Sequence, residues 1–243
     1  MTQAVSFNRA AANTAVVDAI SSAASRTGVD FSYLLANARA ESGLNPAARA
    51  ATSSASGLFQ FTDATWLATV ARHGDQHGLA WAAEALKAGA SGAVRQTILS
   101  LRHNAEMAAT MAAEFTRDNA ARLEGALGRT AGAADLYLAA FFGAGGAIRF
   151  LKTMAAAPGM AAASLLPAAA AANRSTFFAA DGRARSLAEV HEIVAGRINR
   201  HLGDAPAAAG NSLPQAGSAL PPADPALVAA RARMAYLVLV ALQ

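Results

Sequence analysis

A chain of 243 residues is long enough for one large domain with a substantial core and a smaller appendage. Its formal charge is +4, and the basic residues are scattered rather than clustered among aromatic residues, so nucleic-acid binding is not expected.

Alanine accounts for much of the 54% apolar content, and only 6% of the residues are aromatic. Alanine is the strongest helix former, and almost no segment shows the alternation of β-branched residues that is typical of strands. We therefore predict an all-α fold. Helices are expected at 13–27, 31–42, 64–73, 78–88, 91–102, 105–124, 131–142, 145–156 and 187–202.

The expected helix at 187–202 has the clearest boundaries. Ser186 and Glu189 form a capping-box pattern, and Gly203 supplies a stop. Residues 173–181 are expected to form a loop, in which the adjacent Phe177 and Phe178 favour core packing over a position beside a binding cleft.

Composition changes after Gly203. Residues 204–223 are rich in Ala, Pro, Gly and Ser, which predicts a flexible linker. Asp224 and Pro225 then provide an N-cap and a first-turn proline for a helix over 224–243. Its apolar end is far too short to cross a bilayer, so no transmembrane segment is expected there. This helix would either pack back on the domain or dock a partner protein.

Glu41 is the most informative residue. Asp30 is a good N-cap, and no Gly or Pro interrupts residues 31–42 before Gly43 and Pro46, so a helix of about three turns should end beside Glu41. Leu34, Ala38 and Glu41 share one largely apolar face.

A carboxyl group on such a face points toward a core or a cleft wall. Burial disfavours the charged form of a carboxyl group, and the partial negative charge at a helix C-terminus acts in the same direction. Glu41 is therefore a candidate general acid. For an isolated glutamate, an exposed position at a frayed helix end would be the more common outcome.

Two sequence blocks around Glu41 favour the functional interpretation. The first is Glu41-Ser42-Gly43-Leu44-Asn45-Pro46, and the second is Gly57-Leu58-Phe59-Gln60, followed by Thr65 and Trp66. A third block, Leu136-Tyr137 to Gly143, is a variant of a Tyr-Asn-Ala-Gly turn. Together they resemble the soluble lytic transglycosylase family, which has a lysozyme-like domain, over roughly residues 15 to 200. Flagellar and phage-associated variants give the best match in spacing.

The resemblance implies that this chain cleaves peptidoglycan at the β-1,4 bond between N-acetylmuramic acid and N-acetylglucosamine. Glycosidases usually work with two carboxyl groups. A lytic transglycosylase resembles them in its first step but uses one glutamate, here Glu41, first as acid and then as base. The product carries a 1,6-anhydro ring on the muramic acid, and no water is consumed.

Further site residues follow from the resemblance and from side-chain chemistry. Tyr137 would hydrogen-bond Glu41, as the tyrosine of the family motif does, although a buried tyrosine is more often a core aromatic. Hydroxyl and amide groups bind sugar substituents, and aromatic rings cover sugar faces. The expected substrate-binding residues are Ser42, Phe59, Gln60, Phe61 and Tyr137.

No second catalytic acid is evident. Asp63 lies where the helix after Phe61 needs an N-cap, so a capping role is preferred to a catalytic one. His73 and His77 have a spacing that suggests a metal site, but Gly74 and Gly78 interrupt the helix that such ligation needs. We expect no metal and no cofactor.

The location follows from the substrate. Peptidoglycan lies outside the cytoplasmic membrane, and the absence of cysteine is compatible with the periplasm. Residues 1–12 show no secretory signal pattern. We therefore expect a bacterial protein of the periplasm or cell wall whose export signal has been removed or whose export is non-standard, for example through a flagellar apparatus.

The predicted organisation is a catalytic domain at 1–203, a linker at 204–223 and a terminal helix at 224–243. A lysozyme-type hydrolase is the close alternative to the transglycosylase. A catalytically idle wall-binding or scaffold module is the alternative from another class.

Overall fold

The computed structural model describes residues 2–51 and 53–203, with side chains from residue 12 onward. Regular structure in these residues is helical, and β-pairing is confined to isolated bridges. The predicted all-α, lysozyme-like class is confirmed. The predicted linker at 204–223 and terminal helix at 224–243 lie outside the described residues.

The α-helices follow one another through short connections. Their bounds are α1 Thr2–Thr27, α2 Phe31–Ser42, α3 Asp63–His73, α4 Ala80–Lys87, α5 Gly92–Ser100, α6 Ala105–Leu127, α7 Ala133–Ala156, α8 Ala162–Leu165, α9 Pro167–Ala172, α10 Arg174–Phe177 and α11 Leu187–Leu202. Two 3-10 turns connect them, η1 at Gly74–His77 and η2 at Leu101–His103.

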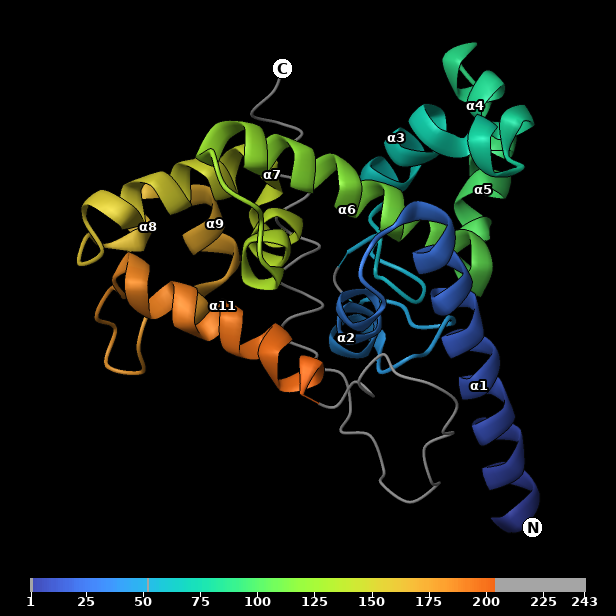
Figure 1. Ribbon diagram of the computed structural model, residues 1–243, viewed down its shortest axis with the longest axis horizontal. Coiled ribbons are helices and arrows are strands. Elements are labelled where there is room, and N and C mark those ends of the chain that lie inside the picture. The colour runs from blue at the N-terminus through green and yellow to red at the C-terminus, as the bar shows by residue number, and fades with distance from the viewer. Residues whose placement is uncertain (1, 52, 204–243) are drawn as a thin grey trace.

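The helix α2 occupies the middle of the structure (Figure 1). It packs against α1 on one side and α11 on the other. The long helix α6 contacts both α1 and α7, and α7 packs against α11. Helices α3, α4 and α5 gather at one end of the molecule, and α8 and α9 lie at the other (Figure 1). The helix that ends in the predicted acid is therefore surrounded by other helices.

Several predicted helix boundaries differ from the structure, and the short helices α8 and α9 were not predicted. Helix α1 begins at Thr2 rather than at residue 13, because no Gly or Pro precedes Gly28 to stop it. The two helices expected at 131–142 and 145–156 are confirmed as the two segments of α7, which meet at a kink at Gly143, whose φ of 72° and ψ of 156° are not helical. The loop expected at 173–181 contains the short helix α10.

Large apolar side chains form one connected core. Phe142 makes ring contacts with Phe141, Phe150 and Phe177, with centroids 4.9 to 5.8 Å apart. Phe177 is fully buried, which agrees with the preference for core packing. Among the described residues, α7 is the one helix long and apolar enough to cross a membrane, but 56% of its apolar window is buried inside the fold. Its apolar surface thus serves mainly as core.

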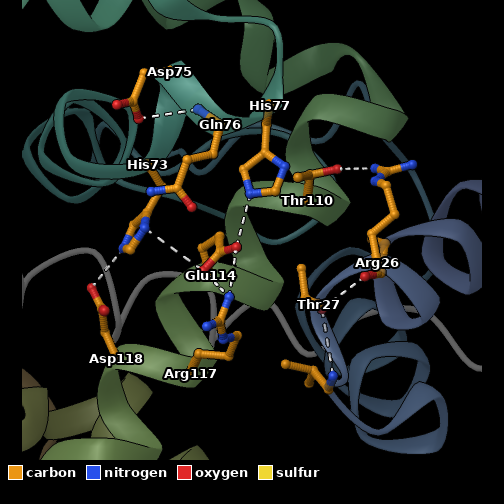
Figure 2. Close-up of polar contacts among 12 residues, drawn as sticks. Arg26, Thr27, His73, Asp75, Gln76, His77, Thr110, Glu114, Arg117 and Asp118 are labelled. Carbon is orange, nitrogen blue, oxygen red and sulfur yellow. Dashed lines mark hydrogen bonds and ion pairs between the residues drawn. The ribbon is translucent and has the colours of Figure 1, made fainter.

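A network of polar side chains joins α3 and η1 to α6 (Figure 2). His77 Nε2 lies 2.8 Å from Glu114 Oε1, and His73 Nδ1 lies 3.7 Å from Glu114 Oε2. Arg117 binds both oxygens of Glu114 at 3.0 Å, while Asp118 binds His73 at 3.1 Å. The two histidines therefore converge, although Gly74 and Gly78 interrupt the helix, and they do so on a buried carboxyl group that an arginine also binds.

Candidate functional site

Helix α2 presents Glu41 in its last turn. The Asp30 carboxyl group caps the start by accepting a 2.7 Å hydrogen bond from Tyr33 N. Gly43 ends the helix in the left-handed conformation, with φ 60°. A residue without Cβ reaches this conformation at little cost, which is why the sequence Ser42-Gly43 stops the helix here. Both predicted ends of this helix are confirmed.

Glu41 is fully enclosed, with an exposed fraction of 0%. Its neighbours on the same helix face, Leu34 and Ala38, are buried as completely. The helix periodicity therefore predicted correctly that this carboxyl group faces inward. A charged side chain is rarely buried to this extent unless another group contacts it or a function requires it.

Ser42 connects the end of α2 to the turn at residues 57–60. Ser42 Oγ lies 2.8 Å from Leu58 O and 3.2 Å from Ala38 O, and it accepts a 3.1 Å hydrogen bond from Asn45 N. The two sequence blocks of the motif are thus brought together in space. Glu41 is covalently next to the residue that makes this connection.

Gly57 occupies a position that no other residue fits. Its φ is 83°, and an added Cβ would lie 2.2 Å from the carbonyl oxygen of Arg102. Its own N–H donates to Ala48 O at 2.8 Å. The glycine that opens the second block is therefore required by a close approach of two backbone segments.

Gln60 closes the same turn with a φ of 47°, in the left-handed region that disfavours a residue with a side chain. Its amide nitrogen donates to Gly57 O at 2.8 Å and to Ala48 O at 3.2 Å. Its amide oxygen is buried and accepts no hydrogen bond within the described residues. A buried acceptor without a hydrogen-bond partner is uncommon in a folded protein.

The predicted sugar-stacking rings are both buried, Phe59 at 5% and Phe61 at 6% exposure. Phe61 packs edge-on against Trp66 at 5.3 Å and against Phe115 at 5.9 Å. Phe61 thus supports the turn from the core side.

Tyr137 is fully buried near the start of α7. This helix packs against α11, which in turn packs against α2, the helix of Glu41. The motif containing Tyr137 ends at the Gly143 kink, where the helix changes direction. The third block therefore belongs to the same helical assembly as the first.

Asp63 has a different role from the one predicted. Thr62 caps α3 by accepting from Thr65 N at 3.3 Å, and Asp63 is the first helical residue. Asp63 Oδ1 instead lies 2.8 Å from Arg102 Nη1. Burial lowers the pKa of the Arg102 guanidinium group, and the neighbouring Asp63 carboxylate acts against that shift.

Two other buried acids, Glu114 and Asp135, bind arginine side chains. Arg129 binds Asp135 at 2.6 and 3.1 Å, and Gly132 N donates to it at 2.9 Å. Burial of Asp135 favours its protonated form, but these hydrogen bonds outweigh burial and keep its pKa below the ordinary value. We assign both carboxyl groups a structural role.

Arg102 and His103 contact the loop between α2 and α3, although sequence reasoning did not identify them. They lie in η2, and nothing in their local sequence marks them out. A short polar pair after an apolar helix is common on a protein surface, so only the tertiary structure shows these contacts. Among the described residues, no group of three or more His, Cys, Asp or Glu side chains is arranged to hold a metal ion.

Comparison with known families agrees with this arrangement. Residues 18–92 match the family described as the transglycosylase SLT domain. The matched segment contains α2, the loop after it, and α3, and therefore Glu41, Ser42 and the turn at 57–60. The family name indicates transglycosylase activity, and the substrate of such domains is peptidoglycan. Residues 18–92 are thus similar to the transglycosylase SLT domain, which agrees with the resemblance of the Glu41 and Gly57–Gln60 blocks to the soluble lytic transglycosylase family.

Proposed function

We propose that the chain is a peptidoglycan lytic transglycosylase in which Glu41 acts as acid and then as base. The observation that carries the proposal is the complete burial of this one carboxyl group at the end of α2, within the segment that matches the transglycosylase family. Its substrate would be the β-1,4 bond between N-acetylmuramic acid and N-acetylglucosamine.

The chemistry needs one proton carrier. Protonated Glu41 donates its proton to the glycosidic oxygen while the bond from that oxygen to C1 of the muramic acid breaks. The resulting carboxylate then takes the proton of the 6-hydroxyl group of the same sugar. The oxygen of that hydroxyl group bonds to C1 and closes the ring. Glu41 ends the cycle protonated, and the 6-oxygen occupies the position on C1 that a water oxygen would take in a hydrolase.

The ion pair between Asp63 and Arg102 supports a mechanism with a single acid. Hydrolysis with two carboxyl groups needs a second one across the scissile bond, about 5 Å or more from the first. Asp63 is the nearest downstream candidate in the sequence, and Arg102 binds it. An ion-paired aspartate at the start of a helix is better explained as a stabilising contact than as a nucleophile.

The proposed substrate-binding residues are Ser42, Phe59, Gln60, Phe61 and Tyr137. The unused amide oxygen of Gln60 could accept from an acetamido N–H group or a sugar hydroxyl. Tyr137 is proposed to orient the Glu41 carboxyl group. Stacking on Phe59 or Phe61 would require the ring to become exposed, because both are buried in the structure described here.

Access to Glu41 requires an opening of its surroundings, since the side chain has no exposed surface. The absence of cysteine makes this testable with a single introduced thiol. Glu41→Cys should react with maleimide slowly in the free protein and faster in the presence of purified glycan strands. The same slow rate with and without glycan would argue against opening by substrate.

The decisive experiment is digestion of purified sacculi by the full-length protein, with mass analysis of the muropeptides. Products carrying 1,6-anhydromuramic acid are expected, each lighter by one water than its hydrolysed counterpart. Glu41→Gln should lower the rate by at least about 100-fold, because a positioned acid or base contributes about 10² to 10⁴. Exposed Glu84, in the same matched segment, provides the control variant Glu84→Gln, which should keep wild-type activity.

The same digestion distinguishes the alternatives. Products with reducing ends would identify a lysozyme-type hydrolase, and full activity of Glu41→Gln would remove Glu41 from the mechanism. Binding to sacculi without any product would identify a wall-binding or scaffold module.

The organisation of the chain is part of the proposal. Residues 1–203 would form the catalytic domain, acting in the periplasm or cell wall, with 204–223 as a linker and 224–243 as a docking helix for a protein partner. Export through a flagellar or other non-standard route remains part of this prediction. Replacing Leu237 and Leu239 by aspartate in the full-length chain should abolish partner capture while sacculus digestion continues; unchanged capture would rule out docking.

A further inference from the structure

The 3-10 turn η2 contacts the loop at residues 43–62, which joins α2 to α3. This turn follows the family-matched segment 18–92 in the sequence. Its residues Arg102 and His103 make the contacts, and we refer to them together as the η2 clamp. They reach both the part of the loop that follows Glu41 and the part that forms the turn at 57–60.

Arg102 binds the second half of the loop. Its Nη1 atom donates to Ser54 O at 2.8 Å and to Phe61 O at 2.9 Å, and it pairs with Asp63. Its Nε donates to Leu99 O at 3.0 Å, which fixes the side chain to its own element. The backbone carbonyl of Arg102 lies against Gly57. Side chain and backbone of one buried residue thus hold both sides of the turn.

His103 joins the two halves of the loop. Its Nδ1 lies 2.9 Å from Pro46 O, and its Nε2 lies 3.2 Å from Ser56 Oγ. Because a carbonyl oxygen only accepts, Nδ1 must carry the proton. Nε2 contacts the Ser56 hydroxyl group, which itself donates to Ala48 O at 3.3 Å. His103 thereby connects the first sequence block, which ends at Pro46, with the residue that precedes Gly57.

The loop needs such support because its backbone is strained at two positions. Leu44 and Gln60 have side chains yet adopt φ values of 64° and 47°. Residues in this region persist where surrounding contacts hold them in place. Since Ser42 Oγ contacts Leu58 O, a displacement of the turn would also change the surroundings of the helix end that carries Glu41.

We propose that Arg102 and His103 are positioning residues that hold the 57–60 turn in register with Glu41. This inference rests on the proposed function of Glu41, and it adds two residues from outside the family-matched segment to the site. They act through backbone carbonyls and the Ser56 hydroxyl group rather than through contact with the glycan.

The test compares variants of the full-length protein on purified glycan strands. His103→Leu removes both loop contacts, whereas His103→Asn keeps a donor near the position of Nδ1. Misplacement of reacting groups by about 1 Å can lower a rate about 100-fold. We therefore expect His103→Leu and Arg102→Lys to lower kcat by about 10- to 100-fold with a smaller change in KM, and His103→Asn to recover most of kcat.

Arg185 offers a matched control for Arg102. Its Nη1 atom donates to Phe178 O at 2.8 Å and to Thr176 O at 3.1 Å, and so holds another loop through backbone carbonyls. That loop precedes α11, whereas η2 lies at the opposite end of the molecule (Figure 1). Arg185→Lys should lower the unfolding temperature without lowering kcat at a temperature where the protein is folded.

A second measurement does not depend on catalysis. Amide hydrogen exchange in residues 43–62 should become faster in His103→Leu and Arg102→Lys, and remain unchanged there in Arg185→Lys. Unchanged amide exchange in this loop, or equal kcat losses in Arg102→Lys and Arg185→Lys, would overturn the positioning role. If the wild-type protein releases no product while the exchange pattern is as expected, the proposed function fails. The η2 clamp then has only the role of holding the loop in place.

Discussion

Gly57→Ala is the sharpest test of the packing that supports the site. The substitution places a Cβ 2.2 Å from Arg102 O and 2.9 Å from the carbonyl carbon, and both atoms belong to backbone that cannot rotate away. A left-handed conformation costs a residue with Cβ about 1–2 kcal/mol. Forcing an extra carbon into a packed site costs about 1–3 kcal/mol more. The expected loss in free energy of unfolding is therefore about 2–5 kcal/mol.

Gly28→Ala is the matched control. Gly28 has a similar φ of 74°, but an added Cβ would meet no atom within 4 Å. This variant should show only the conformational cost, about 1–2 kcal/mol. The two variants should thus differ by about 1–3 kcal/mol, or about 2–12 °C in unfolding temperature for a domain of this size.

Chemical denaturation of both variants, followed by circular dichroism, measures the difference directly. Equal losses in Gly57→Ala and Gly28→Ala would refute the close approach of η2 to the turn. A larger loss in Gly57→Ala, accompanied by faster amide exchange in residues 43–62, would agree with it.

Three further outcomes are expected from denaturation experiments. Asp135→Asn should lower stability by about 1–3 kcal/mol at pH 7, because it removes a charged hydrogen-bond acceptor. The folded-state pKa of Asp135 is depressed, so this contribution is present above the unfolded pKa of about 4 and is lost as pH falls through the folded value. A stability difference between wild type and Asp135→Asn that does not change with pH would contradict the structural role of this carboxylate. Trp66→Phe removes the 2.7 Å hydrogen bond from Trp66 Nε1 to Ile98 O and should cost about 0.5–1.5 kcal/mol, because Leu101 N still donates to that carbonyl. An unchanged stability would show that this bond contributes nothing. Ser186→Ala removes the N-cap of α11 and should cost about 1 kcal/mol, while Ser186→Asp should keep most of the stability.

Helix ends marked by capping residues were predictable because capping is local. Asp30 and Gly43 bound α2, and Ser186 and Glu189 form the capping box of α11. Each signal acts over three or four residues, and the sequence contains all of the partners. Where no such signal exists, as at the start of α1, the prediction was wrong by several residues.

The break at Gly143 within α7 was predictable as well. Gly143 was expected to separate two helices, and its φ of 72° and ψ of 156° are not helical. Glycine reaches such a conformation at little cost. The local sequence does not give the direction of the second segment, which depends on how Phe142 and Phe150 pack in the common core.

By itself, the sequence determined the all-helical class, the inward face of Glu41 and the two blocks that identify the family, since helix periodicity and motif spacing are properties of consecutive residues. Only the tertiary structure decided what distant residues do. It paired Asp63 with Arg102, brought His77 to Glu114, and placed His103 between Pro46 and Ser56. These contacts join residues 37 to 57 positions apart, and their geometry depends on how whole helices pack.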